Sequence, residues 1–167
     1  AAERNEKQAL DLLRQMSENV SDFLFICSLD HKRQYYTSAA FSTVFGCDLS
    51  VLTQSHEQLL ERVHRQDRPL ILNALANAHK GYFVQFRVRR DDGRERMLSV
   101  KARSFRVEGE EELRVCGVVR DITERQRALQ LEYKENLMKQ REEFIATLTH
   151  DLKNPLTGAG FILELIT

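Results

Sequence analysis

The stretch YFVQFRVRRDDGRERMLSVKA, residues 82–102, holds two segments in which apolar and polar residues alternate, with a turn between them. Successive side chains of an extended chain point to opposite faces, so alternate residues share a face. In the first segment, four apolar side chains share one face: Tyr82, Val84, Phe86 and Val88. This alternation predicts a strand that buries one face and exposes the other.

The turn between the two segments is DDGR, residues 91–94. Gly93 readily takes the positive φ angle that a tight hairpin requires. The returning segment places Leu98, Val100 and Ala102 on one face. A second turn at residues 108–110 leads to ELRVCGVVRDI, so we predict an antiparallel meander of three strands.

The residues before this meander add two strands and several helices. Residues 3–19 lack Gly and Pro and repeat apolar residues at helical spacing, which predicts an amphipathic helix. Residues 23–29 and 33–38 read as two strands joined by a turn. Residues 39–61 combine short helical patterns with turn residues, and Asp67 followed by Pro69 predicts the start of a longer helix. The expected fold class is α+β, with a five-stranded antiparallel sheet.

Composition limits the classes of partner and site. Lys plus Arg equals Asp plus Glu, so the charge favours no nucleic-acid partner. The longest purely apolar run, residues 23–27, is far shorter than the roughly 18 residues of a membrane span. Cys27, Cys47 and Cys116 are widely spaced and odd in number, which favours reduced thiols in the cytoplasm and no metal site.

The texture of the chain changes at Thr123. TERQ, residues 123–126, fits a capping box with Thr123 as the N-cap and Gln126 reaching back. No Gly or Pro follows until Pro155. Apolar residues recur at every seventh position: Leu131, Met138, Ile145 and Leu152. Three further apolar residues widen this stripe: Leu137, Phe144 and Leu148.

A sevenfold apolar repeat is typical of helix-on-helix packing, so we expect a homodimer formed through a long coiled-coil helix. The repeat slips near Leu129 and Tyr133, so the seam is imperfect. The alternative is a single amphipathic helix that lies on its own domain. About 30 residues of helix span about 45 Å, which exceeds a domain of this size and favours the dimer.

Several stretches between residues 20 and 123 resemble a PAS domain. They are YYTSAAFSTVFG at 35–46, VHRQDR at 63–68, FRVRRDDGR at 86–94 and the ending Asp121-Ile122-Thr123. The second stretch departs from the usual pattern because Arg65 stands where a proline is common. The resemblance implies a sensor domain whose last strand feeds a signalling helix.

The stretch HDLKNPL, residues 150–156, resembles the H-box of a sensor histidine kinase. The resemblance implies that His150 accepts the γ-phosphoryl group of ATP, with magnesium, and passes it to an aspartate of a response regulator. Asn154 would position water for dephosphorylation. The ATP-binding domain of such kinases is missing, so the chain alone should be inactive and would need that domain in cis or trans.

The expected division is an N-terminal helix at 1–19, a PAS domain at 20–123, a signalling helix at 124–143 and the first part of a dimerisation and histidine phosphotransfer domain at 144–167. The chain still carries a periodic apolar pattern at its end, so we expect a piece of a longer protein, which could be anchored in a membrane. The alternative function is a PAS dimerisation or interaction module that feeds another effector, such as a cyclase.

Helical geometry is consistent with a phosphoacceptor role for His150. Leu148 and Leu152 lie about 200° around the helix from it, so His150 faces water if the leucines are buried. Attack by one ring nitrogen is helped if a carboxylate holds the other N–H, and Asp151 is the candidate. Pro155 cannot donate to the preceding turn, so we expect a kink beside the histidine.

Signal coupling and ligand binding involve other residues. Asp121, next to Thr123, could pair with Arg125 or Arg127 and fix the angle at which the helix leaves the sheet. A haem would need an axial ligand, for which His79 or His64 is the candidate. Phe83, Tyr82, Phe86 and Phe105 could line a pocket or fill the core. The Asn-Cys-Arg-Phe-Leu run of flavin-binding light sensors does not occur in the sequence.

Overall fold

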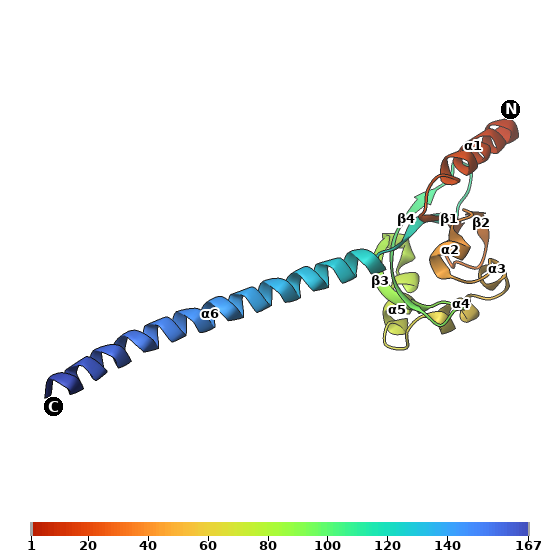
Figure 1. The fold of residues 1–167 in the computed structure, drawn as a ribbon. Coiled ribbons are helices and arrows are strands. Elements are labelled where there is room, and N and C mark those ends of the chain that lie inside the picture. Colours follow the sequence, from red (N-terminus) through yellow and green to blue (C-terminus); the bar gives the residue numbers. More distant parts are fainter. Residues whose placement is uncertain (1, 167) are drawn as a thin grey trace. The chain divides into compact units, whose positions relative to one another are not determined.

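The computed structural model describes the backbone of residues 2–166 and the side chains of residues 3–155. The chain divides into two compact parts, residues 1–124 and 125–167. The first part is built on a five-stranded antiparallel sheet in the order β2-β1-β5-β4-β3 (Figure 1). Its strands are β1 (Phe23–Ser28), β2 (Gln34–Thr37), β3 (Tyr82–Arg89), β4 (Glu95–Arg106) and β5 (Leu113–Asp121). The predicted fold class and meander are therefore confirmed.

Alternation along the strands separates a buried face of the sheet from an exposed one. In β3 and β4, Val84 pairs with Val100 and Phe86 with Leu98, and all four side chains are buried. Phe83, on the opposite face, is exposed. Gly93 has a φ angle of 81° in the hairpin, as the turn sequence predicts. Most of the apolar burial in the first part thus lies on one side of the sheet.

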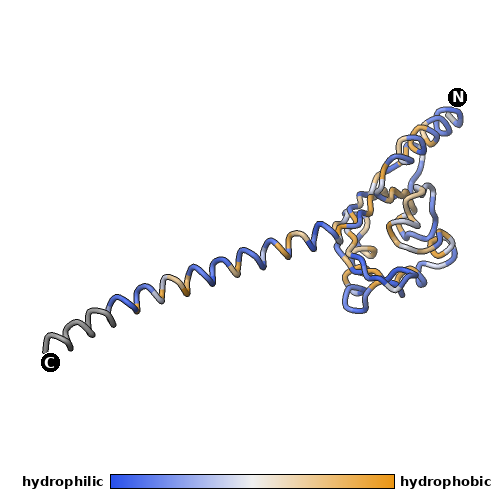
Figure 2. The backbone as a smooth tube through the Cα atoms, in the orientation of Figure 1, coloured by the Kyte–Doolittle hydropathy of each residue, from blue (hydrophilic) through white to orange (hydrophobic). Residues whose placement is uncertain are grey.

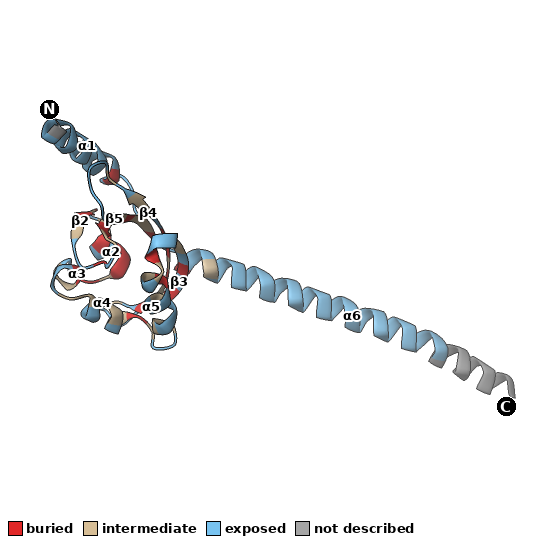
Figure 3. Ribbon diagram, turned by 180° about the vertical axis from the view of Figure 1, so that it is seen from behind, coloured by how far each residue is buried: buried red, intermediate tan, exposed pale blue. Residues whose placement is uncertain are grey.

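Short helices cover this buried face. They are α2 (Phe41–Phe45), α3 (Ser50–Gln54), α4 (His56–Arg62) and α5 (Arg68–Ala76), followed by the 3₁₀ helix η1 (Ala78–Lys80). Phe41, Val44 and Phe45 of α2 join the sheet residues in one core cluster. Figure 3 shows the buried residues gathered on α2 and the strands. The helices and the sheet together enclose the space in which a small cavity remains.

The start of α5 was correctly predicted from Asp67 and Pro69. Asp67 precedes the helix, and its side chain makes no capping hydrogen bond. Its carboxylate instead accepts from the backbone N–H of Arg87 at 2.8 Å and from the guanidinium at 2.8 and 2.9 Å. The carboxylate forms a bidentate ion pair with Arg87 on β3 and does not cap the helix, because charge-assisted hydrogen bonds are stronger than those to neutral N–H groups.

The N-terminal helix α1 (Ala2–Ser17) is anchored at its last residue. Ser17 is buried and hydrogen-bonds to the hydroxyl of Tyr36 on β2. Apolar side chains of α1 remain exposed in this chain, including Leu12 and Met16. The predicted amphipathic helix is therefore present, with one end tied to the sheet edge.

The long helix α6 (Thr123–Ile166) contains the whole predicted signalling segment. Figure 2 shows apolar residues recurring along it, and Figure 3 shows its exposed surface. The helix continues through Pro155, and the kink expected there stays a prediction. The side chains after Pro155, including the apolar terminal pattern, lie outside the described residues. No helix in the described part of the chain is both long and apolar enough to cross a membrane.

Candidate functional site

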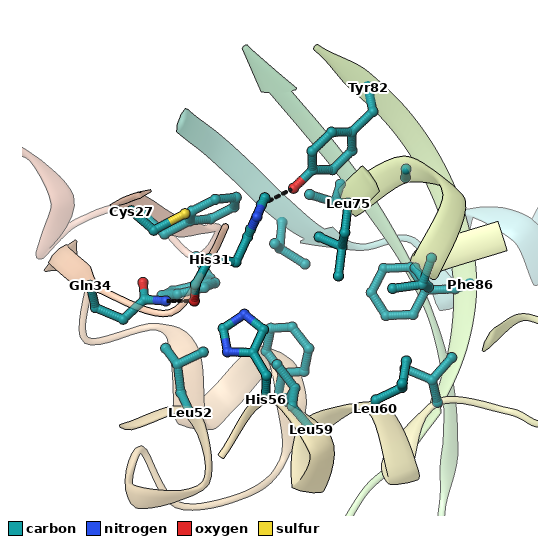
Figure 4. Close-up of a pocket in the computed structure, with 18 residues that line it drawn as sticks. Cys27, His31, Gln34, Leu52, His56, Leu59, Leu60, Leu75, Tyr82 and Phe86 are labelled. Carbon is teal, nitrogen blue, oxygen red and sulfur yellow. Dashed lines mark hydrogen bonds between the residues drawn. The ribbon is translucent and has the colours of Figure 1, made fainter. Parts of the chain in front are cut away.

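A cavity of about 120 Å³ lies between the buried face of the sheet and the short helices (Figure 4). Its walls are mostly aliphatic and aromatic, and they come from strands β1, β2, β3, β4 and β5 and from helices α2, α3, α4 and α5. Tyr82 and Phe86 line it, whereas Phe83 lies on the other face of the sheet. None of the lining residues is Lys, Arg, Asp or Glu.

His31 forms the polar part of one cavity wall. The turn between β1 and β2 holds it at a φ angle of 59°, in the left-handed region. Its Nδ1 lies 3.0 Å from the carbonyl oxygen of Leu29, and its Nε2 lies 3.0 Å from the hydroxyl of Tyr82. A carbonyl can only accept, so Nδ1 carries the proton and Nε2 accepts from Tyr82 in the neutral ring. Burial lowers the pKa of His31, which favours this neutral form.

Two further groups respond to the apolar surroundings of this wall. Burial raises the pKa of the Tyr82 hydroxyl, so it stays protonated and can donate to His31. Burial also raises the pKa of the Cys27 thiol to about 12. Cys27 is therefore an uncharged wall of the cavity and a poor nucleophile at neutral pH.

His56 faces the same cavity from the start of α4. Ser55 caps this helix by accepting the N–H of Glu57 at 3.1 Å, which fixes His56 in the first turn. The rings of His56 and His31 stand 6.1 Å apart, edge to face. Within the described residues, no hydrogen bond engages the ring nitrogens of His56. Burial lowers the pKa of His56, so its imidazole is neutral at physiological pH.

Gln34 closes the cavity beside the β1–β2 turn. Its amide nitrogen donates to the carbonyl of His31 at 3.3 Å. Its Oε1 is buried and has no hydrogen-bond partner among the described residues. A buried acceptor without a partner is unfavourable, so a hydrogen-bond acceptor remains available at this end of the cavity.

The histidines proposed as haem ligands do not line this cavity. His79 is exposed on η1, and its backbone carbonyl accepts from Ser104. His64 lies in the loop before α5, where its Nδ1 accepts from the N–H of Gln66. The described residues hold no cluster of three or more side chains arranged to bind a metal ion. The site residues therefore do not fit a haem bound through either histidine.

A separate cluster joins β4 to the start of α6. The backbone N–H of Met97 donates to the hydroxyl of Thr123 at 2.9 Å, and that hydroxyl donates to Asp121 at 2.6 Å. The backbone N–H of Thr123 also donates to Asp121, at 2.9 Å. Arg96 lies 4.0 Å from Asp121 and 3.3 Å from Glu124.

This cluster differs in detail from the capping box expected at TERQ. Thr123 is the first residue of α6, and its buried hydroxyl binds β4 as well as Asp121. The pair between Asp121 and Arg96 was not predicted, because the two residues become neighbours only through the pairing of β4 and β5. Side chains of Arg96, Asp121 and Thr123 thus connect β4, β5 and the first turn of α6.

Residues 150–155 of the predicted H-box lie on a continuous, exposed stretch of α6. His150 and Asp151 are 74% and 69% exposed at their side chains, and Nδ1 of His150 lies 3.4 Å from a carboxylate oxygen of Asp151. Asn154 and Pro155 are exposed as well. A ring held at Nδ1 leaves Nε2 open to solvent, where a reagent can approach it.

The two cavity histidines were not identified from the sequence. His31 stood in a predicted turn and His56 in a region of short helical patterns, and neither sits in a recognisable motif. A histidine between two strands, at a position that needs a positive φ, is unusual enough to attract attention. Its partner Tyr82 comes from the start of β3, 51 residues later, so only the fold brings the two together.

Comparison with known proteins identifies the fold. A family model described as PAS fold matches residues 34–119. No curated protein sequence matches the chain. Similar solved structures include a sensory box histidine kinase/response regulator from Burkholderia thailandensis E264, with 25% identity over 74% of this chain and 95% of that one, and a TM-score of 0.51.

Two other similar structures come from different signalling proteins. One is a PAS domain from a two-component sensor histidine kinase, with 18% identity over 72% of this chain and 99% of that one, and a TM-score of 0.51. The other is the N-terminal domain of a diguanylate cyclase with a PAS/PAC sensor from Marinobacter aquaeolei, with 15% identity over 63% of this chain and 98% of that one, and a TM-score of 0.54. These two likenesses concern the fold alone.

Proposed function

Because this chain belongs to the PAS fold family, with a sensory PAS domain ahead of a long helix, we propose that it is the sensor and phosphoacceptor part of a two-component histidine kinase. The PAS domain receives the signal, residues 124–143 carry it, and residues 144–167 begin the dimerisation and histidine phosphotransfer domain. His150 is the phosphoacceptor. The observation that carries this proposal is the exposed His150 with Asp151 beside its ring.

The proposed reaction uses the two ring nitrogens differently. Asp151 accepts the proton of Nδ1 in a hydrogen bond, which leaves the lone pair on Nε2 free. Nε2 attacks the γ-phosphorus of ATP, the bond to the bridging oxygen breaks and ADP leaves. As the ring becomes positively charged, Asp151 stabilises it and takes the Nδ1 proton. ATP and magnesium come with the kinase's ATP-binding domain, supplied in cis or in trans.

Phosphotransfer and its reversal involve the neighbouring residues. The phosphoryl group passes from His150 to an aspartate of a response regulator. Asn154 lies one helical turn beyond His150, where its amide can orient a water molecule for dephosphorylation. Pro155 removes a backbone donor from the same turn, and a bend there would change access to the histidine.

The exposed stripe on α6 supports a homodimer. Leu131, Met138, Ile145 and Leu152 are each at least 50% exposed in the single chain. An isolated helix gains little from such side chains in water, whereas pairing with a second copy would bury them. Asp121 and Thr123 would transmit a change in the sheet to the paired helices, because they link β4 to the first turn of α6.

The proposal is tested by supplying a kinase ATP-binding domain in trans. The 167-residue chain is incubated with a separately purified kinase ATP-binding domain, magnesium and ATP labelled at the γ-phosphate. We expect label on the chain and none on the variant His150→Gln. The control His79→Gln changes an exposed histidine elsewhere and keeps the label. Label that survives His150→Gln would sink the assignment.

A second candidate is a PAS interaction module that feeds a different effector. The similar fold of a diguanylate cyclase sensor domain favours it, because such a domain serves an effector that is not a kinase. In that case the H-box residues have no chemical role. The chain would still dimerise, but His150→Gln would leave signalling of the full-length protein intact, which separates the two candidates.

A further inference from the structure

We propose that the cavity of the PAS domain binds a neutral, single-ring ligand with one hydrogen-bonding group, and that His56 is the polar partner of that group. The proposal rests on the proposed sensory function and names the class of molecule that would be sensed. Three properties of the cavity support the proposal: its volume, its lack of charged side chains, and the imidazole of His56, whose nitrogens make no hydrogen bond among the described residues.

The volume sets the size of the ligand. The cavity holds about 120 Å³. An engineered apolar cavity of about 150 Å³ in another protein stays dry and binds benzene. The space beside His56 therefore suits one six-membered ring. The three fused rings of a flavin, or a haem, would need the short helices to move apart.

The lining sets the charge of the ligand. All charged residue types are missing from the walls, which consist of aromatic, aliphatic and a few uncharged polar side chains. Burying a carboxylate or an ammonium group there would leave it without an ion-pair partner, at a large cost in free energy. An anionic or cationic ring would thus bind far more weakly than a neutral one of the same size.

The hydrogen bonds of the walls set the position of the ligand's polar group. Both ring nitrogens of His31 are engaged, by Leu29 and by Tyr82. The amide nitrogen of Gln34 is engaged as well. His56 is the lining residue whose donor and acceptor nitrogens are both open among the described residues. Figure 4 shows the imidazole of His56 pointing from α4 toward His31, with apolar side chains around it.

A neutral imidazole can both donate and accept, so a hydroxyl or a ring N–H of the ligand would find a partner at His56. The unpaired Oε1 of Gln34 lies in the same part of the wall and could accept a second bond after a small rotation. Phenol, benzene and benzoate form a matched set of probes. They share one ring and differ in their hydrogen-bonding group and charge.

The experiment titrates each probe into the 167-residue chain and follows ¹H–¹⁵N and methyl NMR signals of the cavity residues. We expect saturable shifts with phenol, whose dissociation constant should be about two- to tenfold lower than that of benzene, as one net hydrogen bond allows. Benzoate should bind at least about tenfold more weakly than phenol, because its charge is unpaired in the cavity.

Two variants locate the binding. His56→Leu should abolish the preference for phenol over benzene, and Ala74→Leu should weaken both by filling the cavity from α5. His79→Leu, at an exposed histidine outside the cavity, should change neither dissociation constant. Signal dispersion shows that each variant is folded. The proposal is overturned if no probe saturates, if benzoate binds as tightly as phenol, or if folded His56→Leu keeps the phenol preference.

The same titration on His150→Gln separates this proposal from the proposed function. Phenol binding should be unchanged, because His150 is not a cavity residue. Labelling of His150 without phenol binding would contradict the ligand class alone. Phenol binding without labelling would contradict the phosphoacceptor role alone.

Discussion

His31 connects the β1–β2 turn to the far edge of the sheet through a single buried ring. Its left-handed backbone costs free energy for a residue with a side chain, and its two hydrogen bonds offset that cost. His56 faces it across the cavity. A proton on either ring would place a charge among apolar walls, so acid should destabilise the PAS domain.

The first prediction concerns this pH dependence. Burial lowers the pKa values of His31 and His56 in the folded state, so the unfolded chain binds more protons once the pH falls below about 6.5. Stability is therefore full above that pH and is lost as the pH falls toward the lowered folded values. Chemical denaturation at about pH 7.5 and about pH 5.5 should give a smaller unfolding free energy in acid.

The double variant His31→Asn and His56→Gln serves as the comparison, since asparagine tolerates a positive φ angle. Its unfolding free energy should change less between the two pH values than that of the parent chain. Carboxylates with lowered pKa values, such as Asp67, titrate well below this window. An equal pH dependence of both proteins would contradict the role given to the two histidines.

The second prediction concerns the core of the sheet. Leu98 is fully buried on β4, so Leu98→Ala should lower the unfolding free energy by about 2–5 kcal/mol. Leu72 is half-exposed on α5, and Leu72→Ala should change it by less than about 1 kcal/mol. Equal losses in thermal or urea denaturation would show that the exposed and buried faces are wrongly assigned.

Among the helices and strands, the features that depend on local periodicity were predicted from the sequence. The alternation in residues 82–102 gave the strands and their buried face, and Gly93 gave the hairpin. What the patterns could not give depends on pairing between distant strands. Arg96 meets Asp121 only because β4 and β5 are adjacent, and His31 meets Tyr82 only across the sheet.

The site shows the same division. The proposed H-box was predicted from a contiguous stretch, because the residues around His150 lie within two turns of one helix. The cavity could not be identified in this way, because its walls come from nine different elements. Asp67 illustrates the limit: together with Pro69 it marked the helix start correctly, yet the hydrogen bonds of its carboxylate go to Arg87 on β3.

The third prediction concerns the link between β4 and α6. Thr123→Val removes the hydroxyl that accepts from the N–H of Met97, so this amide should exchange with solvent faster. Thr147→Val is the control, because that hydroxyl donates to the carbonyl of Glu143 within the same helix. Unchanged exchange at Met97 in Thr123→Val would contradict the proposed connection.

At the scale of the whole molecule, the stripe on α6 predicts how chains associate. Met138 and Ile145 are exposed and seven residues apart, so the double variant Met138→Glu, Ile145→Glu would place four carboxylates in the seam of a dimer. Sedimentation velocity should show a dimer for the parent chain and a monomer for the variant. Gln140→Glu, off the stripe, should remain dimeric; a parent chain that is monomeric at all concentrations would refute the seam.

If His150 is the phosphoacceptor, a phosphoryl group should be found on that residue. The chain is incubated with a kinase ATP-binding domain and magnesium ATP, digested under alkaline conditions that preserve phosphohistidine, and mapped by tandem mass spectrometry. We expect a phosphoryl group on the peptide that contains His150, assigned to that residue. A chain that remains unmodified, or one modified only at serine, threonine or another histidine, would contradict it.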